Sequence, residues 1–68
     1  MIEFEREITD VDRRPMVINV DNIATVEPVQ PNRTAVNLKD GRVIVATAPY
    51  ATIRELILQA RNQFATTL

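Results

Sequence analysis

The chain has 68 residues, a net charge of −1 at pH 7, and neither cysteine nor histidine. Disulfides and the usual thiolate and imidazole sites for zinc are therefore excluded. The near-neutral charge also argues against general binding to a nucleic-acid phosphate backbone. We expect a single domain over residues 1–68, with no metal and no cofactor.

The small size of the domain limits its stability. A chain of this length gains only a few kcal/mol from its own core, and small domains often gain more from a disulfide, a metal or a partner subunit. A partner subunit is the simplest of these for this composition, so we expect a homo-oligomer. No apolar run approaches about 18 residues, the length that spans a bilayer. We therefore expect a cytoplasmic protein with no membrane span.

Residues 2–8, IEFEREI, alternate between two faces, which is typical of a half-buried strand. Apolar side chains occupy one face, where Arg6 interrupts them, and glutamates occupy the other. Arg6 is expected either to lie near an edge with its head in water or to pair with an acid. A predicted turn over residues 9–15 follows, with Arg13 and Arg14 in a solvated loop tip.

Residues 16–29 contain two apolar runs with a shift of phase between them. Asp21 and Asn22 stand at the junction and indicate a bend or a bulge, because short polar side chains bond to their own backbone. One strand is therefore expected to be broken in two there. Pro28 either ends the segment or leaves it on a sheet edge.

A predicted loop over residues 30–33 leads into the clearest pattern in the chain, TAVNLKDGRVIVAT over residues 34–47. This pattern is typical of two strands that are joined by a two-residue turn. Asp40 and Gly41 predict a type I′ turn, because both central residues of that turn need a positive φ.

The type I′ turn fixes the register of the predicted hairpin. It pairs Leu38 with Val43 and Val36 with Val45 on an apolar face that suits a core. Ile44 then lies on the other face, among small and polar residues, and is expected to be exposed. Together with neighbouring alanines, Ile44 provides a surface for contact between subunits.

The C-terminal segment, residues 47–68, predicts an amphipathic helix. The helix begins either with Pro49 at its first position or with Thr52 as the N-cap of a capping box completed by Glu55. We favour Pro49, because that start gives a longer helix. The apolar face consists of Ile53, Leu56, Ile57, Ala60 and Phe64.

This order of elements predicts an α+β fold. Successive strands and one terminal helix make a small, twisted antiparallel sheet of about four strands, with the C-terminal helix packed on one face.

The chain lacks the residue combinations of most catalytic sites. It has no nucleophile–base pair, since cysteine and histidine are absent and Lys39 stands beside the hairpin turn. Its single glycine, Gly41, belongs to a turn rather than to a phosphate-binding loop. We interpret the glutamates of residues 3–7 as a solvated face rather than a metal site. We therefore expect a protein that is not an enzyme.

Arginine side chains are the best candidates for binding an anion, since the guanidinium suits planar recognition of carboxylate or phosphate. The arginines of the loop tip and the hairpin lie near one end of the predicted sheet. Tyr50 either anchors a partner, if it is exposed, or caps the core where the helix starts. The candidate binding residues are Arg13, Arg14, Arg33, Arg42, Ile44 and Tyr50.

The spacing over residues 19–42 is similar to that of a known family. NVDNIATVE, followed by PNRTAVNLKDGR, resembles the small FlbD/SwrD-type flagellar and swarming-motility proteins, which have this length and also end in a helix. The resemblance implies a small non-enzymatic accessory protein that acts through contacts. The matching positions are Asn19, Asp21, Ile23, Val26, Glu27, Pro31, Thr34, Val36, Leu38, Gly41 and Arg42.

Two functions remain open at this point. We favour a protein-interaction or assembly module of bacterial or phage type that acts as a homo-oligomer on a protein partner. The alternative is a nucleic-acid or nucleotide-type anion binder that uses the arginines. It is less favoured, because single-strand binders normally offer several aromatic stacking platforms and this chain has three aromatic residues.

Overall fold

The computed structural model describes residues 1–9 and 11–65, with side chains up to residue 61. Within these residues, five strands share one antiparallel sheet: β1 (Ile2–Glu7), β2 (Arg13–Ile18), β3 (Ile23–Gln30), β4 (Arg33–Leu38) and β5 (Val43–Ala46). The helical elements are a short 3-10 helix, η1 (Val20–Asn22), and a C-terminal α-helix, α1 (Tyr50–Ala65).

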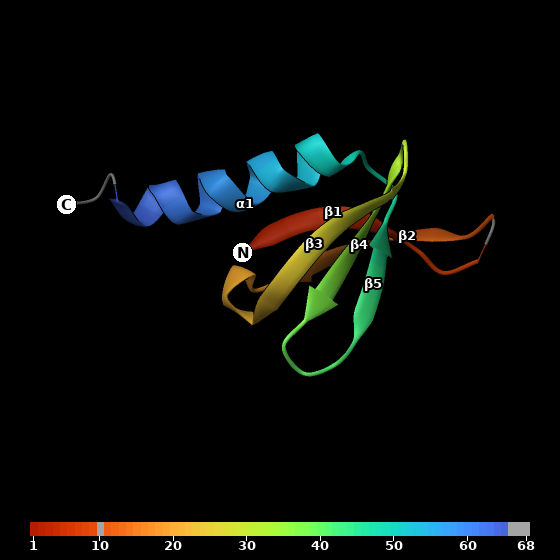
Figure 1. The fold of residues 1–68 in the computed structure, drawn as a ribbon, viewed down its shortest axis with the longest axis horizontal. Coiled ribbons are helices and arrows are strands. Elements are labelled where there is room, and N and C mark those ends of the chain that lie inside the picture. Colours follow the sequence, from red (N-terminus) through yellow and green to blue (C-terminus); the bar gives the residue numbers. More distant parts are fainter. Residues whose placement is uncertain (10, 66–68) are drawn as a thin grey trace.

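The strands lie in the order β2-β1-β5-β4-β3, and α1 packs across one face of the sheet (Figure 1). The predicted α+β fold is therefore confirmed, with five strands rather than about four. The additional strand arises where η1 separates β2 from β3, which is the break that Asp21 and Asn22 predicted.

The η1 turn is held by local hydrogen bonds and by one bond to the hairpin. The side chain of Asn19 accepts from the backbone N–H of Asp21 at 3.0 Å, and the backbone N–H of Asn22 donates to the carbonyl of Asn19 at 3.0 Å. The carbonyl of Asn22 in turn accepts from the backbone N–H of Lys39 at 2.8 Å. Val20 is buried, so the turn is pinned to the core as well.

The connection through η1 also curves the sheet, because it joins the two outermost strands. Five flat strands would place β2 and β3 about 19 Å apart. One 3-10 turn with its flanking residues spans only about 13 Å. The two edges must therefore approach one another at this end, which gives the strong twist that the sequence predicted.

The core fills the space between the concave face of the sheet and α1. The helix buries Ile53, Ile57 and Ala60 against it, and Leu56 is half-buried. Phe64, the last predicted residue of this helix face, has a side chain outside the described residues. The strands and η1 contribute Ile2, Phe4, Ile18, Val20, Ile23, Val36, Leu38, Ile44 and Ala46.

The helix begins at Tyr50, one residue after the start that we favoured. The carbonyl of Pro49 accepts from the backbone N–H groups of Thr52 and Ile53 at 3.1 and 3.2 Å, so Pro49 forms the cap. Thr52 lies inside the first turn, and the alternative start at Thr52 is wrong.

The β4–β5 turn differs from the predicted type I′ turn. Gly41 has a φ of +98°, and no other described residue has a positive φ, so Asp40 does not meet the type I′ requirement. The N–H of Gly41 donates to the carbonyl of Leu38 at 3.1 Å, and the N–H of Leu38 donates to the carbonyl of Arg42 at 2.9 Å. These bonds close a three-residue loop that ends in a left-handed glycine.

The extra loop residue moves the register of the hairpin by one position. Val36 pairs with Ile44, and Asn37 pairs with Val43. Because successive side chains of a strand point to opposite faces, Ile44 enters the core at 3% exposure and Val43 is left 59% exposed. The predicted register and the predicted exposure of Ile44 are therefore wrong.

The predicted turn over residues 9–15 is shorter in the structure, because β2 already begins at Arg13. The loop is closed by Ile8 and Thr9, whose backbone N–H groups donate to the carbonyl of Asp12 at 2.9 and 3.2 Å. Pro15 is tolerated inside β2 because β2 is an edge strand. Pro28 lies in the other edge strand, β3. Of its two predicted placements, the position on a sheet edge is therefore confirmed.

Replacing Gly41 tests the turn. A Cβ at Gly41 would meet no atom within 4 Å, so the cost of a side chain is backbone strain alone. We expect Gly41→Val to cost about 2 kcal/mol and to lower the melting temperature by roughly 10 °C. Gly41→Asn is the matched control and should cost about half as much, because asparagine tolerates positive φ. Equal melting temperatures for all three proteins would contradict the left-handed turn.

Candidate functional site

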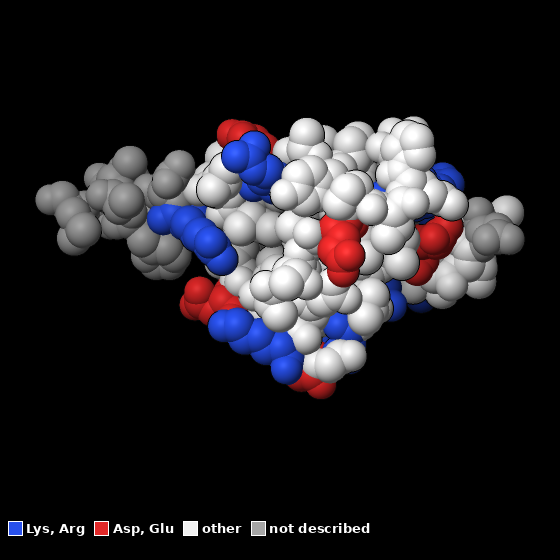
Figure 2. Space-filling view, in the orientation of Figure 1, with Lys and Arg blue, Asp and Glu red and all other residues white. Residues whose placement is uncertain are grey.

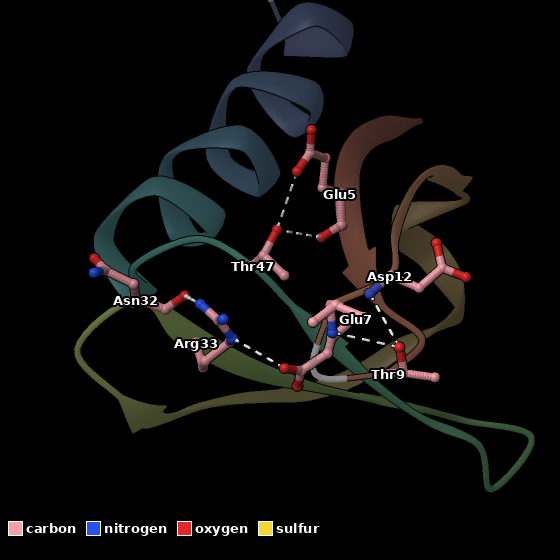
Figure 3. Close-up of polar contacts among 8 residues, drawn as sticks. Glu5, Glu7, Thr9, Asp12, Asn32, Arg33 and Thr47 are labelled. Atoms are coloured by element: carbon pink, nitrogen blue, oxygen red, sulfur yellow. Dashed lines mark hydrogen bonds and ion pairs between the residues drawn. The ribbon is translucent and has the colours of Figure 1, made fainter.

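The predicted arginine cluster is only partly formed. Arg33 starts β4 and reaches Glu7, at the end of β1, with a separation of 3.5 Å between its Nε and the Oε1 of the carboxylate (Figure 3). Both side chains are largely covered, at 20% and 28% exposure. The pair therefore ties β4 to β1 across the end of β5.

Two more arginines lie on the neighbouring edge strand at this end of the sheet. Arg13 is paired with Glu7 in the β1–β2 register and is exposed. Arg14 is also exposed, and its Nη2 lies 3.6 Å from Oδ2 of Asp12. Arg42 lies in the β4–β5 turn, at the other end of β4 from these residues. Its Nε contacts Oδ2 of Asp40 at 2.9 Å. Three of the four predicted arginines therefore have a carboxylate as a close neighbour.

Arg6 does not pair with an acid, so the second of its predicted alternatives is wrong. It lies in β1, an inner strand between β2 and β5, and no acid lies within 4.0 Å of it among the described residues. Its cross-strand neighbours are Arg14 and Ala46. Its Nε is buried without a hydrogen-bond partner.

The other two candidate binding residues, Ile44 and Tyr50, differ in their exposure. Ile44 is enclosed by the core and offers no surface to a partner. Tyr50 opens α1 with 37% of its surface exposed, so it remains accessible at the start of the helix.

A hollow on the described surface lies between β3 and α1, away from the predicted arginines. It has a volume of about 360 Å³. Figure 2 shows the face that contains it, with basic side chains beside the hollow. It is lined by Ile23, Ala24, Thr25 and Val26 of β3 and by Arg54, Ile57, Leu58 and Arg61 of α1. We call this hollow the β3–α1 groove.

The wall formed by β3 is an open sheet edge. Among the described residues, β3 pairs only with β4, so its other side has no strand partner there. Four consecutive residues line the groove, which means that the strand contributes its backbone as well as alternate side chains. Backbone N–H and C=O groups that lack partners at such an edge can pair with another extended chain.

The helical wall carries the charge of the groove. Arg54 and Arg61 line it, and no acidic residue does. Glu55 lines a separate hollow on another side of α1. Glu27 accepts a hydrogen bond from Asn37 at 3.1 Å, on the face of the sheet away from the core. Within the part of the chain that the structure describes, neither groove arginine has a carboxylate within 4.0 Å.

Sequence reasoning missed this groove because it needs two segments that are 28 or more residues apart in the chain. The helical half did leave a signal. Arg54, Leu58 and Arg61 follow the i, i+4, i+7 spacing of one helix face. Nothing in the sequence indicated that this face would border the open edge of β3.

Comparison with family models, curated proteins and solved structures gives no match for the chain. The resemblance to FlbD/SwrD-type proteins therefore stays a prediction. Across residues 1–9 and 11–65, no helix is long and apolar enough to cross a membrane. The same residues contain no group of three or more acidic side chains placed to hold a metal ion.

The contact between Asp40 and Arg42 affects the protonation of the Asp40 carboxyl. The pKa of the Asp40 carboxyl is held below its usual value of 3.8, chiefly by the hydrogen bond from the backbone N–H of Arg42 at 3.0 Å and also by the guanidinium. Because the folded-state pKa is the lower one, ionised Asp40 stabilises the turn above pH 3.8. That contribution is lost as the pH falls through the folded-state pKa.

Arg42→Ala separates the two causes, since it removes the guanidinium and keeps the backbone N–H. We expect the pKa of Asp40 in this variant to remain below 3.8, measured from the carboxyl carbon shift by NMR titration. A return to the ordinary value would make the guanidinium, rather than the backbone bond, the main cause.

Proposed function

We propose that this protein is a small, non-enzymatic protein-interaction module that works as a homo-oligomer. The proposal places it in the cytoplasm as an accessory protein of bacterial or phage type. The resemblance to FlbD/SwrD-type proteins supports the same kind of role, in which a small chain acts through contacts rather than through chemistry.

The observation that carries the proposal is the uncovered face of the sheet. The helix α1 covers one face only (Figure 1). The register of the hairpin puts Val43 and Val45 on the opposite face, next to Ala35 of β4. Val43 remains 59% exposed at the start of β5, where it pairs with Asn37 of β4. We call these three residues the helix-free patch; Val43 supplies most of its exposed surface, since Val45 is half-buried and Ala35 is 9% exposed.

A second copy of the chain is the partner that the size argument favours for this patch. A domain of 68 residues has little stability to spare, and burying apolar surface between subunits adds to it. A two-fold contact brings the same patch from both subunits together, so Val43 would meet apolar side chains of its copy.

The alternative role as an anion binder lacks comparable support. Arg14, Arg33 and Arg42 have carboxylates at 3.6, 3.5 and 2.9 Å, so a phosphate would compete with an acid at each of them. Arg42 also lies at a different end of β4 from Arg33.

The oligomeric state tests the proposal. We expect native mass spectrometry and sedimentation to give a multiple of the 7.7 kDa chain mass. Val43→Glu should convert the assembly to a folded monomer, because a charge in the contact is not compensated. Val11→Glu is the matched control, since Val11 is 92% exposed in the β1–β2 loop and outside the patch. A monomeric wild-type chain, or equal dissociation by both substitutions, would contradict the proposal.

A further inference from the structure

We propose that the β3–α1 groove binds an extended, acidic peptide segment of another protein, which adds to the sheet as a strand beside β3. This inference rests on the proposed interaction role and gives that role a partner of defined chemistry.

The first half of β3 is the segment of open edge that strand addition would use, and its regular part begins at Thr25, because the register of β3 against β4 shifts between Ile23 and Thr25. Residues 23–27 contain no proline, and residues 23–26 line the groove. The other edge strand, β2, has Pro15 in its middle and exposed arginines before it, and both features discourage pairing. An added strand at β3 would gain main-chain hydrogen bonds, as in other complexes in which a peptide extends a sheet.

The apolar part of the groove provides a place for a side chain of the added strand. Ile23 and Ile57 are buried beneath it, while Leu58 stands above at 38% exposure. A strand beside β3 would point alternate side chains toward α1. An apolar side chain at one such position would cover Leu58 and remove it from water.

The charge of the groove selects an acidic partner. Arg54 and Arg61 are two helical turns apart, a separation of about 10.5 Å along the axis, with Leu58 between them. In an extended chain, side chains at i and i+4 share a face and are about 13 Å apart. The reach of the arginine side chains covers the difference. A partner with acids at i and i+4 and an apolar residue at i+2 therefore matches the groove.

A second copy of the chain fits this groove poorly. If β3 paired with β3 of a copy about a two-fold axis, both helices would lie on the same face of the joined sheet. Arg54 and Arg61 of the two subunits would then confront one another without acids in the groove lining to offset them. The homo-oligomeric contact and the peptide site therefore belong to different surfaces.

A charge-swap experiment tests the inference. The probe is a fluorescent seven-residue peptide with glutamate at its second and sixth positions, valine at its fourth and threonine elsewhere. Fluorescence anisotropy should detect binding to the wild-type chain, and replacing both glutamates by lysine should weaken it at least about tenfold. The chain with Arg54→Glu and Arg61→Glu should show the reverse preference and bind the lysine peptide more tightly.

Two controls separate strand addition from a general charge effect. Arg13→Gln removes an exposed arginine from the opposite edge of the sheet and should leave the affinity unchanged. A peptide with alternate N-methylated amides keeps its charges but cannot pair with β3, and it should lose binding. No binding of the glutamate peptide, equal binding of both charge forms, or unimpaired binding of the methylated peptide would each overturn the inference.

Native mass spectrometry of the same samples distinguishes failure of this inference from failure of the proposed homo-oligomer. An oligomer that does not bind the peptide refutes the inference alone. A monomer that binds it with the expected preferences supports the inference while refuting the oligomer. If the wild-type chain were an oligomer and the chain with Arg54→Glu and Arg61→Glu were a monomer, both without peptide, the groove would be the contact with a second copy. That result would overturn the inference.

Discussion

The left-handed turn at Gly41 is the constraint on which the core depends. With a positive φ at one residue only, the β4–β5 loop has three residues, and the register places Ile44 and Ala46 on the same face as Val36. A two-residue loop would have turned every side chain of β5 to the other face. The same register leaves Val43 outside, so one turn defines both the core and the helix-free patch.

A second constraint, the short connection through η1, determines the shape around that core. Because β2 and β3 are the outer strands and are joined by a few residues, the sheet curls and α1 fits its concave side (Figure 1). The curl does not close the sheet, since β2 and β3 do not pair. One open edge therefore runs beside the helix, and the groove is a consequence of this incomplete closure.

The arginines divide into two groups according to their neighbours. Arg14, Arg33 and Arg42 have carboxylates close by, and the Arg33–Glu7 pair joins separate strands (Figure 3). Arg54 and Arg61 border the groove with no acid in its lining. The loop and hairpin arginines thus have acids beside them, whereas the helical arginines that line the groove do not, a distinction that depends on which acids the fold brings within reach.

The sequence alone determined the α+β class, the break at Asp21–Asn22, the edge position of Pro28 and the buried face of α1 from Ile53 to Ala60. Each of these follows from local periodicity or from the conformational limits of one or two residues. Tertiary structure alone decided the hairpin register, the pairing of Arg33 with Glu7 and the β3–α1 groove. The turn type of an Asp-Gly pair depends on how the two strands meet the core, and the pair and the groove join residues far apart in the chain. Local patterns carry no information about such contacts until the sheet has curled and the helix has packed upon it.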